Sequence, residues 1–432
     1  MQKLGINVIR SYNVDGDLNH DECASIFNSV GIYMILDVNS PLPGGSIDRD
    51  NPGPSYNLAY LNRTFAIVDA FRGYPNTLGF FGANELINNP ANAASDPPYI
   101  RAVQRDLKQY IAARGGRTIP VGYSATDVYV PDTSAYLQCS IQGEANDISR
   151  SDFFGLNSYS WCGAATFQTS GYDVLANSFV NSTIPAFFSE YGCNNVEPRV
   201  FSEVQALYGP NMTDFSGGLV YEWTQGITNF GLVQVHADNS AQLLVDYNNL
   251  QAQYGRLNLT LLQSSNSTAR NLKPPICSAG LLPSGSVIST NFTIPIAPAG
   301  VEQLIRSGIN GNIGSIISVT QTSVPYPVTN VQGSLISNLV ITPVANNVAN
   351  TPSNGAGTIM STSAASTTGT SAPTTAAAVT GTATQTGAAA TTSSKAAAVA
   401  LGPRTQYAGL SIGSSVLLYF GYALCASARY SL

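Results

Sequence analysis

Two glutamates stand where apolar runs end, in surroundings suited to acid–base and nucleophilic chemistry. Glu85 follows residues 80–84, and Glu190 follows residues 187–189. A carboxylate at the end of an apolar strand is costly unless it has a use. Cleavage of a glycosidic bond with retention needs two such groups about 5–5.5 Å apart. One protonates the leaving oxygen and the other attacks the anomeric carbon.

Asn84 stands directly before Glu85. Its amide is able to hydrogen-bond a sugar 2-hydroxyl, a contact that strengthens in the transition state. For one glutamate alone, the simpler interpretation is a neighbour of a helix N-cap or a buried ion-pair partner. An Asn-Glu pair at one strand end, with a second Glu at another, favours catalysis.

Seven short apolar runs are expected to position these side chains. They are rich in Val, Ile, Phe and Tyr without alternation, which is typical of strands buried on both faces of a parallel sheet. The runs cover residues 6–12, 31–38, 77–85, 118–126, 153–159, 185–192 and 217–223. Helix-compatible stretches lie between several of them, at residues 20–30, 60–74, 98–114 and 197–208. This order predicts right-handed βαβ units.

The predicted fold is α/β, a (β/α)8 TIM barrel lacking its first strand, because we count seven strands of the eight required. With the absent strand counted, Glu85 ends the fourth strand and Glu190 the seventh, on opposite sides of the barrel mouth. Polar side chains close most runs where this fold carries its chemistry, namely Tyr12, Asp37, Glu85, Asp127, Asn157, Glu190 and Glu222. An open doubly wound sheet is the alternative, but no Gly-rich nucleotide loop follows an early strand.

Composition changes along the chain predict four regions. We expect a truncated (β/α)8 catalytic domain at residues 1–255 and a small β-rich segment packed on the barrel at 256–345. A disordered Ser/Thr/Ala-rich linker is expected at 346–398, followed by a GPI-attachment signal at 399–432. Small residues, a spacer and the apolar run 408–425 favour that signal. A single transmembrane helix is the alternative.

Composition also indicates the cellular compartment of the protein and excludes one class of partner. Only 10% of the residues are charged and the net charge is −6, which argues against nucleic-acid binding. Six Asn-X-Ser/Thr sequons and six cysteines point to the secretory route. The first residues do not form a signal peptide, so we expect an N-terminal part to be missing. His20 and His236 are far apart, and no metal or other cofactor is expected.

Several motifs occur in order at compatible spacing. They read NVIRSY at 7–12, HDEC at 20–23, YPNTL at 74–78, NE at 84–85, NSYSWCG at 157–163, SEYGC at 189–193 and GGLVYEW at 217–223. Over roughly residues 1–280 the chain resembles the fungal β-1,3-glucanosyltransferases of glycoside hydrolase family 72. It departs from the family at Gly226, where a Glu is usual, and at Gly82-Ala83, where Ala-Gly is frequent.

The resemblance implies a retaining transfer between β-1,3-glucan chains, with Glu85 as acid/base and Glu190 as nucleophile. The substrate-binding residues expected at the strand ends and from the resemblance are Tyr12, Asn84, Asn157, Tyr159, Tyr191, Tyr221 and Glu222. The resemblance also implies disulfides Cys162–Cys193 and Cys139–Cys277, and pairing of Cys23 with an upstream cysteine.

The expected partners are a glucan donor and acceptor and, through the GPI lipid, the outer face of the plasma membrane and the cell wall. We expect the protein to be a monomer. Two rival functions remain open, a hydrolytic retaining endo-β-glucanase and a non-catalytic glucan-binding wall protein.

Overall fold

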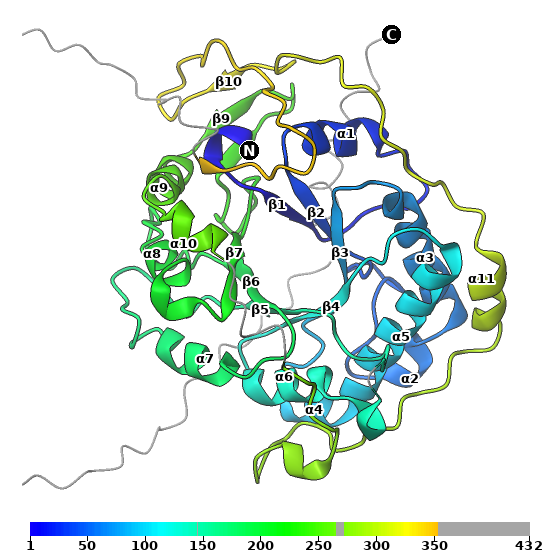
Figure 1. Ribbon diagram of the computed structural model, residues 1–432. Helices are drawn as coiled ribbons and strands as arrows, with labels where there is room; N and C mark the ends of the chain where they lie inside the picture. Colours follow the sequence, from blue (N-terminus) through cyan, green and yellow to red (C-terminus); the bar gives the residue numbers. More distant parts are fainter. Residues whose placement is uncertain (145, 265–271, 353–432) are drawn as a thin grey trace, which may run out of the picture. The chain divides into compact units, whose positions relative to one another are not determined.

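Seven parallel strands form a barrel-like sheet in chain order. The computed structural model describes residues 1–144, 146–264 and 272–352. Figure 1 shows the strands as an inner ring with helices around it. They are β1 (Val8–Ser11), β2 (Tyr33–Asp37), β3 (Thr77–Asn84), β4 (Val121–Ala125), β5 (Phe154–Asn157), β6 (Ala186–Tyr191) and β7 (Phe215–Val220). Each falls within a predicted run except β7, which starts two residues early, so the predicted barrel of seven strands is confirmed.

Helices follow most of the strands and cover the outside of the ring. The four predicted stretches correspond to α1 (Asp21–Ser29), α3 (Leu58–Arg72), α5 (Pro97–Arg114) and α8 (Glu203–Leu207), and the first three agree with the prediction to within two residues at each end. Helix α8 is much shorter than predicted, because Pro198 disfavours helical backbone at Glu197 and Phe201 has a φ of 51°, which a right-handed helix does not allow. The other helices beside the barrel are α2 (Pro52–Ser55), α4 (Pro90–Ser95), α6 (Val130–Gln138) and α7 (Tyr172–Phe179).

The lower part of the barrel interior is apolar. Ile35, Phe81 and Phe153 form a buried cluster, and Phe187 packs against it. Gly122 makes room for this layer, since a Cβ at that position would lie 2.4 Å from the Phe153 ring. The aromatic layer therefore fills the barrel below the ends of the strands, where the polar side chains gather.

The chain beyond β7 adds two small groups of elements. Strands β8 (Val233–Val235) and β9 (Ala241–Leu243) pair antiparallel, and β10 (Val328–Thr329) pairs parallel with β9. The helices are α9 (Val245–Tyr254), α10 (Leu259–Gln263) and α11 (Val301–Ser307). Single turns of 3-10 helix complete the described elements, at η1 (Gln2–Leu4), η2 (Ile141–Gly143), η3 (Pro210–Met212) and η5 (Ala279–Leu281).

Residues 272–352, which we call the outer strap, pass around the outside of the helices (Figure 1). The strap is held by side chains of the barrel. Arg105 of α5 donates to the Pro295 carbonyl at 2.7 Å, and the Asn350 amide of the strap donates to the Ile6 carbonyl at 2.8 Å. The strap thus joins the far side of the barrel to the segment that precedes β1.

The predicted linker beyond residue 352 and the predicted anchor signal at 399–432 lie outside the described residues. Within the part of the chain that the structure describes, no helix has the length and apolar character needed to span a bilayer.

The ring of strands has one open seam. Among the described residues, β1 and β7 lie at the two edges of the sheet and are not hydrogen-bonded to each other. A cavity of about 2130 Å³ runs along this seam and continues into the barrel mouth. Its apolar stretch is lined by side chains such as Val8, Leu219, Leu250 and Tyr254.

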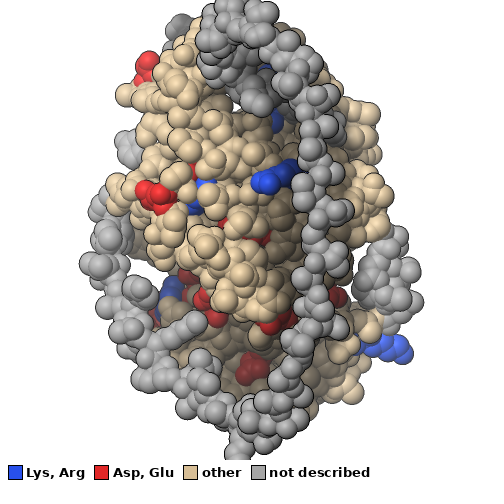
Figure 2. Space-filling model, turned by 90° about the vertical axis from the view of Figure 1, so that its left-hand side faces the viewer, with Lys and Arg blue, Asp and Glu red and all other residues tan. Residues whose placement is uncertain are grey.

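Charged side chains are sparse on the face shown in Figure 2, which is dominated by uncharged residues. This agrees with a chain in which 10% of the residues are charged.

Both disulfides implied by the resemblance are present. Cys139–Cys277 ties the end of α6 to the outer strap, and Cys162–Cys193 ties the loop after β5 to the loop after β6. Cys23 is also disulfide-bonded, and its expected pairing with an upstream cysteine stays a prediction.

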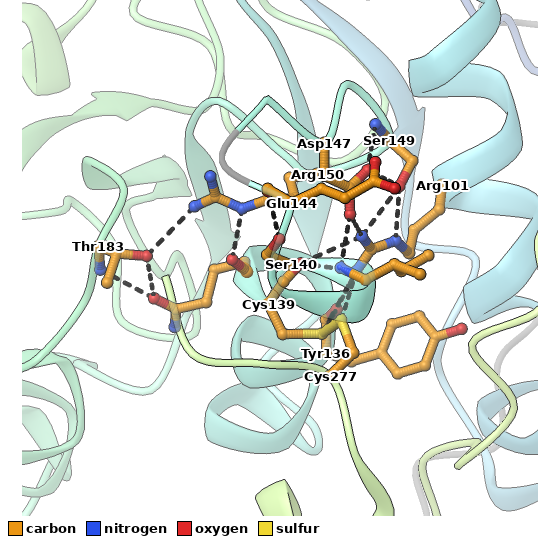
Figure 3. The surroundings of a disulfide bond; sticks show 12 residues. Arg101, Tyr136, Cys139, Ser140, Glu144, Asp147, Ser149, Arg150, Thr183 and Cys277 are labelled. Atoms are coloured by element: carbon orange, nitrogen blue, oxygen red, sulfur yellow. Dashed lines mark hydrogen bonds and ion pairs between the residues drawn. A yellow bond between two sulfur atoms is a disulfide. The ribbon is translucent and has the colours of Figure 1, made fainter. Parts of the chain in front are cut away.

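A buried arginine organises the surroundings of the first disulfide (Figure 3). The Arg101 side chain is fully buried and pairs with Asp147 at 2.8 Å. It also donates to the Tyr136 and Cys139 carbonyls at 2.8 and 3.1 Å and to the Ser149 hydroxyl at 2.9 Å. One cation therefore satisfies several buried oxygens beneath α6.

We expect Arg101→Met to lower the free energy of unfolding by about 3–5 kcal/mol, because it leaves Asp147 with a buried and uncompensated charge. The matched control is Arg306→Met, since Arg306 is 66% exposed in its pair with Glu302. That change is expected to cost at most about 0.5 kcal/mol. Thermal and urea unfolding of the two variants compare these costs, and equal losses would contradict the role given to Arg101.

Candidate active site

The two candidate carboxylates lie at the same end of the barrel. Glu85 comes directly after β3, and its backbone N–H donates to the Ser124 carbonyl at 2.8 Å. Its φ of 51° lies in the left-handed region, which non-glycine residues seldom adopt. The exceptions cluster at functional sites. Glu190 lies in β6, in register with Asn157 of β5. Both side chains line the cavity at the barrel mouth.

Arg10 of β1 is the centre of a buried polar network. It binds Asp37 through two hydrogen bonds, of 2.8 and 3.0 Å. It also donates to Glu190 Oε1 at 3.2 Å and to Asn84 Oδ1 at 2.8 Å. The Arg10 side chain is 2% exposed, so these contacts are made away from bulk water. One guanidinium therefore sets the positions of groups from three other strands.

Asn157 connects this network to the second carboxylate. Its amide nitrogen donates to Glu85 Oε1 at 2.9 Å. Its amide oxygen accepts from Ser124 and Ser189 and lies 3.4 Å from Arg10 Nη1. Glu85 and Glu190 are thus joined through the contact of Asn157 with Arg10, and they are near enough for the Glu85 charge to raise the pKa of Glu190.

The environment of Glu190 acts on its pKa in opposing directions. Burial raises the pKa of this carboxyl above its ordinary value. The Arg10 cation and hydrogen bonds from Tyr159 and Tyr12 act against that shift. The Tyr159 hydroxyl donates to Glu190 Oε2 at 2.7 Å, so each carboxylate oxygen has a donor.

Aromatic rings gather beside the mouth, and two of them, Tyr12 and Tyr221, line its cavity. We call Tyr12, Tyr159, Tyr221 and Phe230 the aromatic wall. The Tyr12 and Tyr221 rings meet edge to face with centroids 5.9 Å apart, and Phe230 lies 5.5 Å from Tyr159 and 5.3 Å from Tyr221. The Arg10 guanidinium lies 4.3 Å from the Tyr12 ring centroid. Apolar ring faces beside carboxylates suit a ligand such as a sugar, which has both C–H faces and hydroxyls.

The remaining part of the mouth is formed by loops. Residues of the loop after β2, including Asn39, Arg49 and Asp50, line the same cavity as Glu222 and Trp223. Glu222 adds a third carboxylate, and burial raises its pKa. The arrangement is a cleft with carboxylates at its base and aromatic side chains on one wall.

The structure brings together all but one of the predicted site residues, namely Tyr12, Asn84, Glu85, Asn157, Tyr159, Glu190, Tyr221 and Glu222. The structure places Tyr191 away from this group. Successive residues of a strand point to opposite faces, so Tyr191 turns away from the side that Glu190 occupies. Its ring is buried, and its hydroxyl meets that of Tyr254 at 3.0 Å.

Sequence reasoning missed Arg10 and Phe230 as site residues, and it noted Asp37 only as a polar strand end. A signal for Arg10 was present, because a cation inside an apolar strand needs a buried anion. Phe230 had no such signal, since it lies in a loop whose path the sequence pattern does not specify.

The described residues contain no group of three or more His, Cys, Asp or Glu side chains arranged to hold a metal ion. His20 stacks on Phe71 with centroids 4.6 Å apart, and its Nε2 lies 2.8 Å from the Asp15 carbonyl oxygen.

Comparison with known proteins identifies relatives of this chain. The family model described as glucanosyltransferase, of glycoside hydrolase family 72, matches residues 1–258. The 1,3-β-glucanosyltransferase gel2 of Aspergillus fumigatus is 49% identical over 356 residues, which are 82% of this chain and 74% of that protein. The probable 1,3-β-glucanosyltransferase GAS3 of Saccharomyces cerevisiae is 45% identical over 350 residues, which are 78% of this chain and 67% of that protein.

A solved structure from the same group of proteins resembles this chain. Saccharomyces cerevisiae Gas2p in complex with laminaritriose and laminaritetraose has a TM-score of 0.60 and 33% identity to this chain. The match covers 70% of this chain and 66% of the solved chain. By sequence and by fold, the chain belongs to the glucanosyltransferase family, glycoside hydrolase family 72.

Proposed function

We propose that this protein is a β-1,3-glucanosyltransferase that cleaves and rejoins cell-wall β-1,3-glucan by retaining double displacement. The observation that carries this proposal is the joining of Glu85 and Glu190, across one cleft, through Asn157 and Arg10. Two carboxylates at the mouth of a barrel are the groups that retention requires. Membership of the glucanosyltransferase family and the laminari-oligosaccharides bound by Gas2p support β-1,3-glucan as the substrate.

The surroundings of the two glutamates support different roles. Glu190 receives the Arg10 cation and the Tyr159 hydroxyl, which favour the ionised form that a nucleophile needs. Glu85 accepts from the neutral amide of Asn157 and belongs to none of the ion pairs of the described residues. This contrast in partners leaves Glu85 as the candidate for the acid/base role.

The proposed cycle has two displacements. Glu190 attacks the anomeric carbon of the donor while Glu85 protonates the glycosidic oxygen, and the bond from that carbon to the leaving sugar breaks. A glucosyl ester of Glu190 remains. Glu85, now a carboxylate, takes the proton of the 3-hydroxyl at the non-reducing end of a second glucan. That oxygen attacks the anomeric carbon and releases Glu190, so a longer chain forms.

The aromatic wall and the polar network supply the remaining contacts. Tyr12, Tyr159 and Tyr221 present rings on which glucosyl units stack, and Asn84 and Glu222 supply groups that bond hydroxyls. Transfer exceeds hydrolysis only where an acceptor glucan fills the cleft and excludes water. The extended cavity beside the carboxylates supports such occupancy.

We also propose that the protein works as a monomer on the outer face of the plasma membrane or in the cell wall, held by a GPI anchor. Disulfides are typical of oxidising compartments and support an extracellular site. Five sequon asparagines of the described residues expose their side chains, at Asn62, Asn181, Asn211, Asn258 and Asn291. The anchor rests on the sequence pattern at residues 399–432.

We expect Glu85→Gln and Glu190→Gln each to lower the rate of laminari-oligosaccharide elongation by roughly 10²-fold or more. Glu203→Gln is the matched control, since Glu203 is also buried but does not line the cavity. Chromatography of the products measures the rate. Products longer than the substrate require transfer, and shorter products alone would indicate an endo-glucanase. Full activity of Glu190→Gln would contradict its role as nucleophile. Wild-type protein that binds laminari-oligosaccharides without elongating or cleaving them would support a non-catalytic binding protein.

We expect Glu190→Gln to raise the Tm at neutral pH. The folded-state pKa of Glu190 lies above its unfolded value, so stability is lost as the pH rises through the folded-state pKa. The amide removes this cost, while Arg10 keeps its pair with Asp37. The gain should disappear below pH 4.5, the ordinary pKa of a glutamate, because Glu190 is then neutral in both the folded and the unfolded protein. Thermal unfolding at several pH values measures it, and a lower Tm at neutral pH contradicts the prediction.

We expect protein recovered from a eukaryotic secretory host to carry N-linked glycans at exposed sequons. Treatment with an N-glycosidase should lower its apparent mass, and replacement of one sequon asparagine by Gln should remove one step of that change. Protein from the same host without any glycan would contradict passage through the secretory route.

A further inference from the structure

We infer that Arg199 is a positioning residue that sets the affinity for glucan by fixing the loop that carries half of the aromatic wall. This inference rests on the proposed function. Arg199 lies in the segment between β6 and α8, and its side chain is 1% exposed. It touches neither candidate catalytic carboxylate in the described hydrogen bonds, so its influence on the cleft passes through the backbone it holds.

The guanidinium holds three backbone carbonyls that come from different segments. Nη1 donates to the Tyr221 carbonyl at 2.7 Å and to the Gly192 carbonyl at 3.2 Å. Nη2 donates to the Phe230 carbonyl at 2.5 Å. Gly192 follows the strand of Glu190, while Tyr221 and Phe230 are the first and last residues of a loop at the mouth. One side chain thus joins both ends of that loop to the end of β6.

The loop at residues 221–230 carries recognition groups at both ends. Tyr221 and Phe230 belong to the aromatic wall, and Glu222 is the third carboxylate of the cleft. The Glu222 backbone N–H donates to the same Phe230 carbonyl at 3.0 Å. The loop is therefore a closed turn whose base is bonded to Arg199. Without Arg199, the loop keeps its own backbone bonds but loses the cation that joins both of its ends to Gly192 and, through Asp246, to α9.

Arg199 is itself rigidly held. Asp246 of α9 accepts its Nε at 2.6 Å and its backbone N–H at 3.0 Å. Asn249, one helical turn further on, donates to the Arg199 carbonyl at 2.7 Å. The side chain is fixed by α9 at one end and fixes the loop at the other, which is the arrangement expected of a positioning group.

Arginine is required at this position for a geometric reason. Its planar fork presents donors in fixed directions, so it binds Asp246 and three carbonyls at once. A lysine has one compact ammonium, and it is able to keep the ion pair with Asp246 but not the contacts with Tyr221, Gly192 and Phe230 together. Arg199→Lys therefore removes the fixing of the loop while it leaves Asp246 paired.

The test is steady-state transfer kinetics of the full chain on laminari-oligosaccharides, together with thermal unfolding. For Arg199→Lys we expect KM to rise by roughly tenfold, with kcat within about threefold of wild type, because the binding wall loosens while the carboxylates keep their own network. The matched control is Arg101→Lys. Arg101 is another fully buried arginine that pairs with an aspartate and donates to backbone carbonyls. Neither Arg101 nor any of these partners lines the cavity. It should lower the Tm and leave KM unchanged.

Asp246→Asn is the second variant, in case Arg199→Lys does not fold. It weakens the hold on Arg199 without removing the guanidinium, and we expect a several-fold rise in KM. An unchanged KM in Arg199→Lys, or in Asp246→Asn where the first variant does not fold, overturns the inference. Loss of kcat with unchanged KM overturns it as well.

The two proposals fail in different ways. Wild-type protein that neither elongates nor cleaves laminari-oligosaccharides contradicts the proposed function itself. Wild-type protein that elongates them, with Arg199 and Asp246 variants of unchanged KM, contradicts only the role of Arg199.

Discussion

A single buried cation governs the arrangement of the site. Arg10 lies inside the barrel, and Asp37 alone makes a bidentate pair with it. Burial acts to lower the pKa of Arg10, but the nearby carboxylates outweigh it, and the pKa lies above its ordinary value. A charge so deeply placed must be fully hydrogen-bonded, because an unpaired one costs several kcal/mol. The positions of Glu190, Asn84 and Asn157 follow from that requirement, since their oxygens are the acceptors within reach.

This requirement explains the division of the barrel into two layers. Below the strand ends, Phe81, Phe153 and Phe187 fill the interior, and the Arg10 guanidinium lies 4.4 Å from the Phe81 ring centroid. Above it lie the carboxylates and the aromatic wall. The apolar layer excludes water from one side of the network, which strengthens its hydrogen bonds. Side chains held in this way lose little freedom when a ligand binds.

Much of the fold was predictable because it depends on local patterns. The seven strands are unbroken apolar runs, and each long helix has the expected length and period. The two glutamates were predictable for the same reason, since a charged residue at the end of an apolar strand is conspicuous. Three features of the site were missed. Tyr191 was assigned to the cleft against the strand alternation that turns it away from Glu190, Phe230 depends on the path of a loop, and the importance of Arg10 depends on partners up to 180 residues away.

The outer strap has a consequence for the order in which the molecule is assembled. Asn350 bonds the Ile6 carbonyl across 344 positions of sequence, next to the strand that carries Arg10. During synthesis the ribosome must release residue 350 before this contact forms, at a rate of about 5–20 residues per second. The segment that precedes β1 therefore waits tens of seconds, on the order of this rate, for the contact that holds it. During this interval the nascent chain lacks this contact, and incompletely folded chains of this kind are the species that chaperones bind.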